Sequence, residues 1–479
     1  MKNVDISRDS FDALQGFSRL VWQQGRPQLD ADLNEQSSIL LQTLRTMMTD
    51  LVGRFGGPVG LCGFRIVLTA ADLDEEFTQA DRKALQSELD GLAAGDLILS
   101  KGRYYVDGLL CDNPGPLCYS QQAPHAHRNG GIHEAGSYLV YLDVWEHEVT
   151  ALDTAAIREV ALGGVDTAAR MRVAWQVRAM ALQTKAASFA SLNPKWDALT
   201  ASWSRERRGT LRARARPADD GQGDGNGDGR GPRTYRGPEN QLYRVEIHRG
   251  GKAGDRPAPS FKFSRDNGVV AFAVASLADD GLSVTLANWA RDDTMSLATG
   301  QFVELVHDER TPREHAPPLA RVLTVDPVTR TVTVDTALTQ HIPQRDAVLV
   351  LRRWDQRAGD PQKGGLQLAE NAAAIVEQQW LALEDGIEIM FDQADDHEYR
   401  SGDYWLIPAR VATGDVLWPQ RDDEPAALPP HGIDHHYAPL AIVESDGEKL
   451  SLVVPLTRRF GARTLESFAD DMFVYKGQV

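Results

Sequence analysis

The 479-residue sequence lacks most features that would assign a function class directly. It has three cysteines, Cys62, Cys111 and Cys118, whose spacing matches no metal-ligand motif. We therefore expect them to be small side chains with reduced thiols, buried or half-buried, in a reducing compartment. No apolar run approaches the roughly 18 residues that would span a bilayer, and the first residues lack the apolar core of a secretion signal. We therefore expect synthesis in the cytoplasm without a signal peptide, and no membrane insertion.

Basic residues are too few for a nucleic-acid-binding protein. The chain has 51 Lys and Arg against 68 Asp and Glu, a formal net charge of −17. Binding to phosphates requires a dense basic face, and the one strongly basic stretch, RERRGTLRARAR at 205–216, is followed at once by an Asp-rich loop. We therefore expect no nucleic-acid partner.

Motifs of the common enzyme classes are also missing. The sequence has no Walker A motif, no dinucleotide-binding fingerprint and no Gly-x-Ser-x-Gly elbow. Carboxylates lie near histidines at 143–148 and 395–398, but such clusters on strands are usually solvated faces. We expect no catalytic residue and no cofactor.

Two segments resemble metal sites weakly. The first, Asp224-Gly-Asn226-Gly-Asp228-Gly229, places oxygen ligands as at the start of a calcium loop. The position where such a loop has its last glutamate is Tyr235, and glycine-aspartate tracts arise easily in linkers, so we favour a linker.

The second segment carries three histidines within six residues, His431, His435 and His436. A metal site would need them to converge, as they would on a helix. Flanking prolines favour an extended turn instead, so we expect hydrogen-bonded or surface histidines and no metal.

The hydrophobic pattern predicts a mainly β protein with an N-terminal helix, α+β overall, built from several small sandwich-like or barrel-like domains. Residues 136–152 are apolar on both faces, which indicates a buried strand. Short strands recur through 260–353, with a hairpin turn at Asp326, which is typical of a small barrel or sandwich. An Ala- and Leu-rich stretch at 365–383 predicts a short helix. The expected division of the chain is 1–55, 56–204, a flexible loop at 205–238, 239–364, and a C-terminal helix plus β region at 365–479.

The strongest helical signal covers about 33–52. It begins within the last residues of the segment QQGRPQLDADLNE at 23–35. The acids in this stretch fit a capping box, with Asp32 as N-cap and Glu35 three residues on. Asp30 adds negative charge at the positive end of the helix dipole. The helix carries an apolar stripe, which predicts either a surface that packs on a partner or the cover of the chain's own β domain. The residues expected to dock a partner are Arg26, Leu29, Leu33, Leu40, Leu44, Met47 and Leu51.

Three blocks together carry a resemblance to a family. They are SRDSFDALQGFSRLVWQQGRPQLDADLNEQ at 7–36, SKGRYYVDGLLCDN at 100–113, and YRSGDYWLIPARVATGDVLWP with its continuation PPHGIDHHYAPLAIV at 399–443. They resemble uncharacterised proteins encoded with phage-tail-like contractile injection systems, and the first block also looks like the opening of some phage tail and baseplate proteins. Leu33 stands where that family often has Trp.

The resemblance implies a non-catalytic structural or adaptor component of such a particle, at the baseplate, fibre or spike level. Its implied partners are baseplate or spike proteins and further copies of the chain, a trimer among the candidates, in a particle that can be released from the cell. Two alternatives are kept: a carbohydrate- or receptor-binding module, and, with less support, a delivered hydrolase or toxin. The aromatic residues that motivate the binding module are Tyr404, Trp405, Trp418 and Tyr437.

Overall fold

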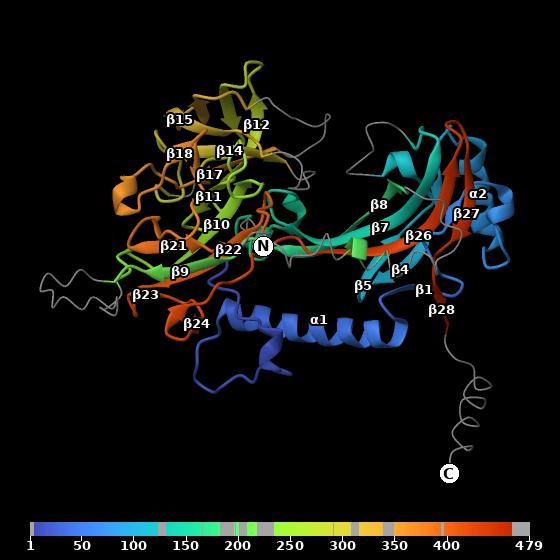
Figure 1. The fold of residues 1–479 in the computed structure, drawn as a ribbon, viewed down its shortest axis with the longest axis horizontal. Coiled ribbons are helices and arrows are strands. Elements are labelled where there is room, and N and C mark those ends of the chain that lie inside the picture. Colours follow the sequence, from blue (N-terminus) through green and yellow to red (C-terminus); the bar gives the residue numbers. More distant parts are fainter. Residues whose placement is uncertain are drawn as a thin grey trace, which may run out of the picture.

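The computed structural model shows a mainly β protein in which a long N-terminal helix lies along one side of two β lobes (Figure 1). It describes residues 4–122, 131–164, 166–182, 196, 198–200, 208–217, 234–290, 292–307, 316–338, 349–393 and 397–461. Strands take up 39% of the chain and helices 15%, which confirms the expected fold class. Within these residues, no helix is long and apolar enough to cross a membrane.

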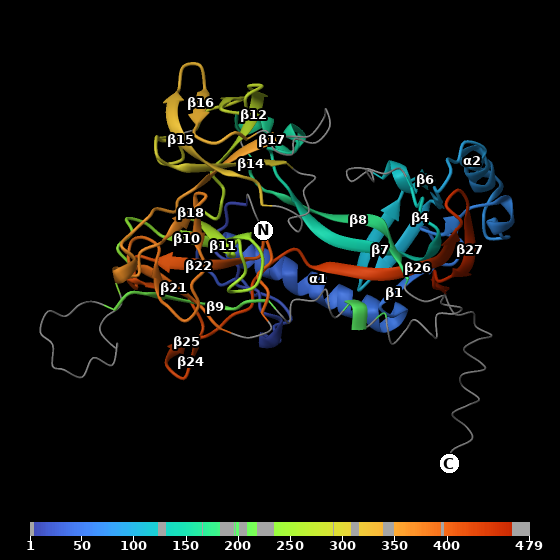
Figure 2. The same ribbon diagram turned by 45° about the horizontal axis from the view of Figure 1, so that its top comes forward.

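The N-terminal helix, α1 (Asp30–Val52), follows an irregular segment that contains one short 3-10 turn, η1 (Ala13–Gln15). It ends where the sequence predicts, at Gly53, whose N–H donates to the carbonyl of Thr49 at 2.8 Å. In both views α1 runs from the base of one lobe to the base of the other (Figures 1 and 2).

The first lobe, which we call the β7 lobe, is built around a long antiparallel sheet with the order β27-β26-β7-β8. A four-stranded sheet, β28-β1-β4-β5, and a small sheet, β2-β3-β6, pack with it around one apolar core. One helix, α2, lies at its rim, beside short 3-10 turns. The bounds are β1 (Phe55–Pro58), β2 (Ile66–Val67), η2 (Ala70–Asp72), α2 (Gln79–Asp90), β3 (Ile98–Leu99), β4 (Gly102–Val106), β5 (Leu109–Asn113), β6 (Leu117–Cys118), η3 (Tyr119–Gln121), β7 (Gly136–Val149), η4 (Ala155–Ile157), η5 (Val160–Leu162), β8 (Arg170–Ala181), β26 (His435–Ser445), β27 (Leu450–Pro455) and β28 (Arg459–Phe460).

The second lobe, which we call the β10 lobe, contains a six-stranded sheet with the order β18-β19-β11-β10-β22-β23. A three-stranded sheet, β20-β21-β9, closes over its apolar face and completes a second core. The bounds are β9 (Leu211–Ala215), β10 (Gln241–Arg249), β11 (Ser260–Ser264), η7 (Pro361–Lys363), β18 (Leu368–Ala369), β19 (Ala372–Ala374), β20 (Leu381–Ala382), β21 (Ile387–Phe391), β22 (Tyr404–Arg410), β23 (Asp415–Val416), β24 (Gln420–Arg421) and β25 (Glu424–Pro425).

A closed barrel lies on the β10 lobe, with the strand order β12-β13-β16-β15-β14-β17 (Figure 2). Its valine-rich strands alternate buried and outward residues around a separate core. Of the two forms expected for 260–353, a small barrel or a sandwich, the structure has the barrel, with the hairpin turn after Asp326; β11 at the start of this range belongs to the six-stranded sheet instead. The bounds are β12 (Ala271–Leu277), β13 (Ser283–Leu286), β14 (Phe302–His307), β15 (Leu319–Asp326), β16 (Thr331–Val334) and β17 (Leu349–Trp354).

The helix expected at 365–383 is wrong, because this stretch forms the short strands β18, β19 and β20. Glu370 and Asn371 both have positive φ, 49° and 65°, and make the tight turn between β18 and β19. Gln378 is a third residue with positive φ. A right-handed helix cannot pass through these left-handed positions, so the Ala- and Leu-rich composition was misleading here.

Candidate docking surface

The segment that precedes α1, residues 4–29, is an arm that crosses the β10 lobe before it reaches the helix. The Asn267 side chain donates to the carbonyl of Val4 at 3.0 Å, and the Arg410 guanidinium donates to the carbonyl of Ser7 at 2.9 Å. Ile6 between them is buried. A pocket of about 330 Å³ remains between the arm and this lobe. Its lining contains arginine side chains as well as aspartate side chains. We call residues 4–29 the N-terminal arm.

The acids at the start of α1 hold the arm instead of capping the helix. Asp30 accepts hydrogen bonds from the backbone N–H and the hydroxyl of Ser7, at 2.8 and 2.7 Å. Glu35 accepts from the hydroxyl of Ser10 at 2.5 Å. The helix begins at Asp30 with Leu29 as N-cap and no side-chain cap, so the capping box expected from Asp32 and Glu35 is wrong.

The ionised form of Asp30 is favoured by these contacts. Partial burial opposes ionisation, but the hydrogen bonds from Ser7 outweigh it and lower the pKa of the carboxyl. The contacts at this helix start are therefore structural: the carboxylates of Asp30 and Glu35 bind serines of their own chain, and within the described residues they belong to no group that could hold a metal ion.

The inner side of α1 is attached to the body through few residues. Ala31, Ile39 and Val52 are its buried side chains. Arg45 forms an ion pair with Glu146 of β7 at 2.7 Å. The β4–β5 turn approaches the helix closely at Gly108, where an added Cβ would lie 2.7 Å from the Arg45 backbone. The helix is therefore held along one side and leaves the opposite side open.

The open side carries the apolar stripe. The stripe residues have exposed fractions that range from 43% at Leu29 to 79% at Leu51. Arg26 is exposed as well. Because the stripe faces away from the β sheets, the alternative that it covers the chain's own β domain is wrong. The exposed stripe residues are Leu29, Leu33, Leu40, Leu44, Met47 and Leu51.

The N-terminal arm carries further exposed apolar side chains. They come from the segment around η1 and from the stretch before Gly25, and the arm is bound to α1 by the side chain of Gln36, which accepts from the N–H of Leu20 at 2.8 Å. Contiguous apolar surface on a soluble protein marks an interaction site. The exposed apolar side chains of the arm are Leu14, Phe17, Val21 and Trp22.

The three histidines of the C-terminal segment do not converge. His435 and His436 are consecutive residues of β26 and bond to different carboxylates, His435 to Asp143 at 2.5 Å and His436 to Asp107 at 3.0 Å. The backbone of His431 pairs with that of Tyr404. Each histidine therefore has a different partner. This agrees with the extended segment that the flanking prolines predict.

Across the residues that the structure describes, no group of three or more His, Cys, Asp or Glu is placed to hold a metal ion. Asp224, Asn226 and Asp228, the candidates for a calcium loop, lie outside the described residues. The three cysteines are buried and free, and burial raises the pKa of the Cys62 thiol to about 11.

Arginines of the basic stretch and the candidate sugar-binding aromatics interact with other groups of the same chain. On β9, Arg212 pairs with Asp392 and Arg214 with Glu388, each at 2.9 Å, so these two arginines of the described part, 208–216, are neutralised within the chain. The candidate sugar-binding aromatics are buried. The indole N–H groups of two of them, Trp405 and Trp418, donate to backbone carbonyls. The aromatic platform that motivated a carbohydrate-binding module is therefore not on the surface.

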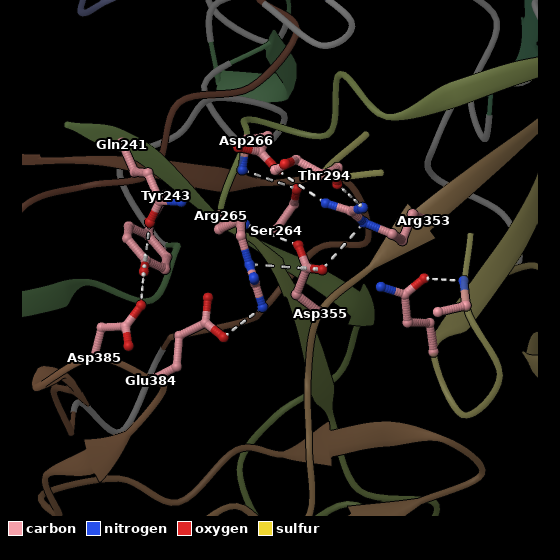
Figure 3. A network of polar contacts seen from close by, with 12 residues as sticks. Gln241, Tyr243, Ser264, Arg265, Asp266, Thr294, Arg353, Asp355, Glu384 and Asp385 are labelled. Atoms are coloured by element: carbon pink, nitrogen blue, oxygen red, sulfur yellow. Dashed lines mark hydrogen bonds and ion pairs between the residues drawn. The ribbon is translucent and has the colours of Figure 1, made fainter. Parts of the chain in front are cut away.

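Sequence reasoning missed a buried polar network between the six-stranded sheet and the barrel (Figure 3). Arg265 donates to Glu384 at 2.7 Å, and Arg353 pairs with Asp355 at 3.2 Å and with Asp266 at 3.0 Å. Burial raises the pKa of Glu384 to about 7; Arg265 opposes that shift and the charge of Asp355 adds to it. Burial and the charge of Asp355 likewise raise the pKa of Asp266 to about 6, against the effect of Arg353.

A second part of this junction contains a buried lysine. The ammonium of Lys262 on β11 lies 2.6 Å from both carboxylate oxygens of Glu304 on β14 and 4.4 Å from the ring centre of Trp354. The Trp354 indole donates to the same carboxylate at 2.9 Å. Lys262, Glu304 and Trp354 satisfy one another across the two sheets, so we assign this part of the network a structural role. The only sequence signal for it is the placement of charges in strands whose two faces are otherwise apolar, as in LVLRRW at 349–354.

Comparison with known proteins gives a family and no activity. The model of a family of unknown function, DUF6519, matches residues 1–229 and 210–453. No curated protein and no solved structure matches the chain.

Proposed function

We propose that this chain, which belongs to the DUF6519 family, is a non-catalytic structural component of a contractile injection system or phage-tail-like particle. Its place would be at the baseplate, fibre or spike level, and it would join its neighbours through the N-terminal arm and α1. The family is one of unknown function, so the particle assignment is supported by the resemblance of the blocks at 7–36, 100–113 and 399–443.

The observation that carries the docking role is the outward stripe of α1. A lone soluble chain gains nothing from leucines kept in water, because each buried leucine side chain would stabilise the fold by about 1.5–3 kcal/mol. Here Leu40, Leu44 and Leu51 are all more than half exposed on an otherwise well-formed helix. A partner that covers them explains the pattern, and an active site does not require it.

The tie between arm and helix also supports docking. Asp30 and Glu35 bind Ser7 and Ser10, which ties the arm to the first turns of α1 before any partner arrives. Preorganisation of this kind lowers the entropy cost of association. The acids at the start of α1 would therefore serve to present a surface and not to cap the helix.

The test is incorporation of the full chain into particles. Contractile particles purified from cells that produce a tagged chain should contain it, and Leu40→Glu/Leu44→Glu should remove it from the particle fraction while leaving the soluble protein folded. The matched control is Gln42→Glu/Thr46→Glu, which adds the same charge at exposed positions of α1 that lie off the stripe. Particles that lack the wild-type chain would refute the assignment, and a stripe variant that still enters them would refute docking through α1.

A further inference from the structure

The spacing of the exposed side chains on α1 is that of a coiled-coil seam. Leucine or methionine occurs at 33, 40, 44, 47 and 51, and Ser37 completes an alternation of four and three residues from 33 to 51. This alternation defines the a and d positions of a heptad repeat. The surface is thus a narrow strip that fits another helix better than it fits a loop or a sheet.

The positions beside the seam specify what kind of helix fits. On one side they are Asn34, Leu41 and Met48, and on the other Gln36, Thr43 and Asp50. Charged residues at these positions normally select a different partner and set its orientation. Asp50 is the one charged residue among the six, so nothing here opposes the approach of a second copy of the same helix.

Leu41 and Met48 also widen the apolar face. Leu41 is 45% exposed, and together with the seam it gives three apolar columns instead of two. A two-stranded coiled coil buries the two seam columns, whereas a helix bundle with more members buries a third. The wide face therefore favours more than two helices.

We propose that three copies of this chain associate through α1, which forms a parallel three-helix bundle around a three-fold axis. The proposal rests on the proposed function, because the bundle would be the form in which the chain enters its particle. A three-fold rotation makes all three helices point the same way. The occupant of each exposed stripe is then the stripe of the next copy.

The available area agrees with three copies. A 23-residue helix is about 34 Å long, and a single strip of that length is small beside the roughly 800 Å² that each partner contributes to a standard interface. In a three-helix bundle each α1 contacts two neighbours, and Phe17, Val21 and Trp22 are further exposed apolar side chains on the arm segment that Gln36 ties to α1. Two helix contacts for each α1, with the exposed side chains of the arm, provide more area than a single strip.

The test begins with the mass of the purified full chain in solution. Sedimentation velocity at micromolar concentration should give three times the 52.7 kDa of one chain. Leu40→Glu/Leu44→Glu should give the mass of a single chain with an unchanged circular dichroism spectrum, and Gln42→Glu/Thr46→Glu should keep the threefold mass. A wild-type monomer, or a stripe variant that keeps the wild-type mass, would overturn the proposal.

A cross-link tests the parallel orientation. All three native cysteines are buried, so Leu44→Cys introduces a single accessible thiol at the seam. In a parallel bundle these thiols from different copies lie side by side, and mild oxidation should link two chains; Gln42→Cys, off the seam, should not. Equal linkage of both variants, or none of Leu44→Cys, would exclude the parallel bundle.

The two proposals fail in different ways. A wild-type chain that is monomeric in solution but enters particles would overturn the bundle and leave the structural role. A trimer that no particle contains would leave the bundle and overturn the role.

Discussion

The outer face of α1 and the junction beneath the barrel reverse the usual distribution of side chains. On α1, leucines and a methionine face solvent. At the junction, Lys262, Arg353 and their carboxylate partners are buried between two sheets. The charged groups at the junction have their partners within the chain, whereas the apolar side chains of the α1 stripe are 43–79% exposed.

This difference separates what the chain needs to fold from what it needs to assemble. A buried charge with a good partner contributes little net stability, but its loss leaves the other charge alone in the interior. An exposed leucine contributes little to its own chain, and its removal costs little. We therefore expect large folding effects at the junction, and assembly effects without folding effects on α1.

The largest effect should come from Lys262→Met. The substitution removes the ammonium group that lies 2.6 Å from both oxygens of the buried Glu304 carboxylate, and breaking a buried pair in this way costs about 3–5 kcal/mol. Denaturant unfolding followed by tryptophan fluorescence should show the transition of the β10 lobe at lower denaturant.

The double variant Lys262→Met/Glu304→Gln is the control. A neutral glutamine still accepts from the indole, so the double variant should recover most of the loss. A double variant as unstable as the single one would show that packing, and not the unpaired charge, decides the effect.

A smaller effect is expected from Glu384 and depends on pH. Because its pKa rises from 4.5 to about 7 on folding, the folded state binds the proton more tightly. The free energy of unfolding should therefore fall as pH rises from about 4.5 to about 7, by at most about 3 kcal/mol from this group, and level off above that. Glu384→Gln should remove this part of the slope when unfolding is measured at each pH. Parallel slopes for the two proteins would contradict the raised pKa.

Local sequence patterns predicted much of the fold. Residues 136–149, apolar on both faces, form the central strand β7, and the regular short strands of 260–353 form the barrel. The pairing of β7 with β26 joins Trp145 to His435 across 290 residues, and no local pattern contains that information. The helix α2 was missed, although Thr78 caps it by accepting from the N–H of Asp81.

The candidate surface was predictable in its residues but not in its direction. A helical period shows that the leucines of α1 share one face, and it cannot show whether that face points inward or outward. The junction was missed for the opposite reason: charged residues such as Arg353 in a strand normally face solvent, and only the tertiary arrangement supplies their partners.

A moderate, local effect is expected where the arm joins α1. Asp30→Asn weakens the two hydrogen bonds from Ser7, at a cost of about 1 kcal/mol. The arm should then open more often, and trypsin should cut faster after the exposed Arg19, while global unfolding stays unchanged. Asp32→Asn removes a carboxylate from the same turn without removing these bonds and should leave the cleavage rate as it is; equal rates for all three proteins would show that Asp30 does not hold the arm.

The smallest effect on folding should come from the stripe, and adjacent residues of α1 make the comparison direct. Ile39 is 3% exposed and Leu40 is 54% exposed. In the Leu44→Glu background, where the expected loss of association leaves the fold alone to be measured, Leu40→Ala should change the free energy of unfolding by no more than about 0.5 kcal/mol. Ile39→Ala in the same background should cost about 2–5 kcal/mol. Similar losses at both positions would mean that the outer face is packed against the chain itself, and the contrast between the two regions would then disappear.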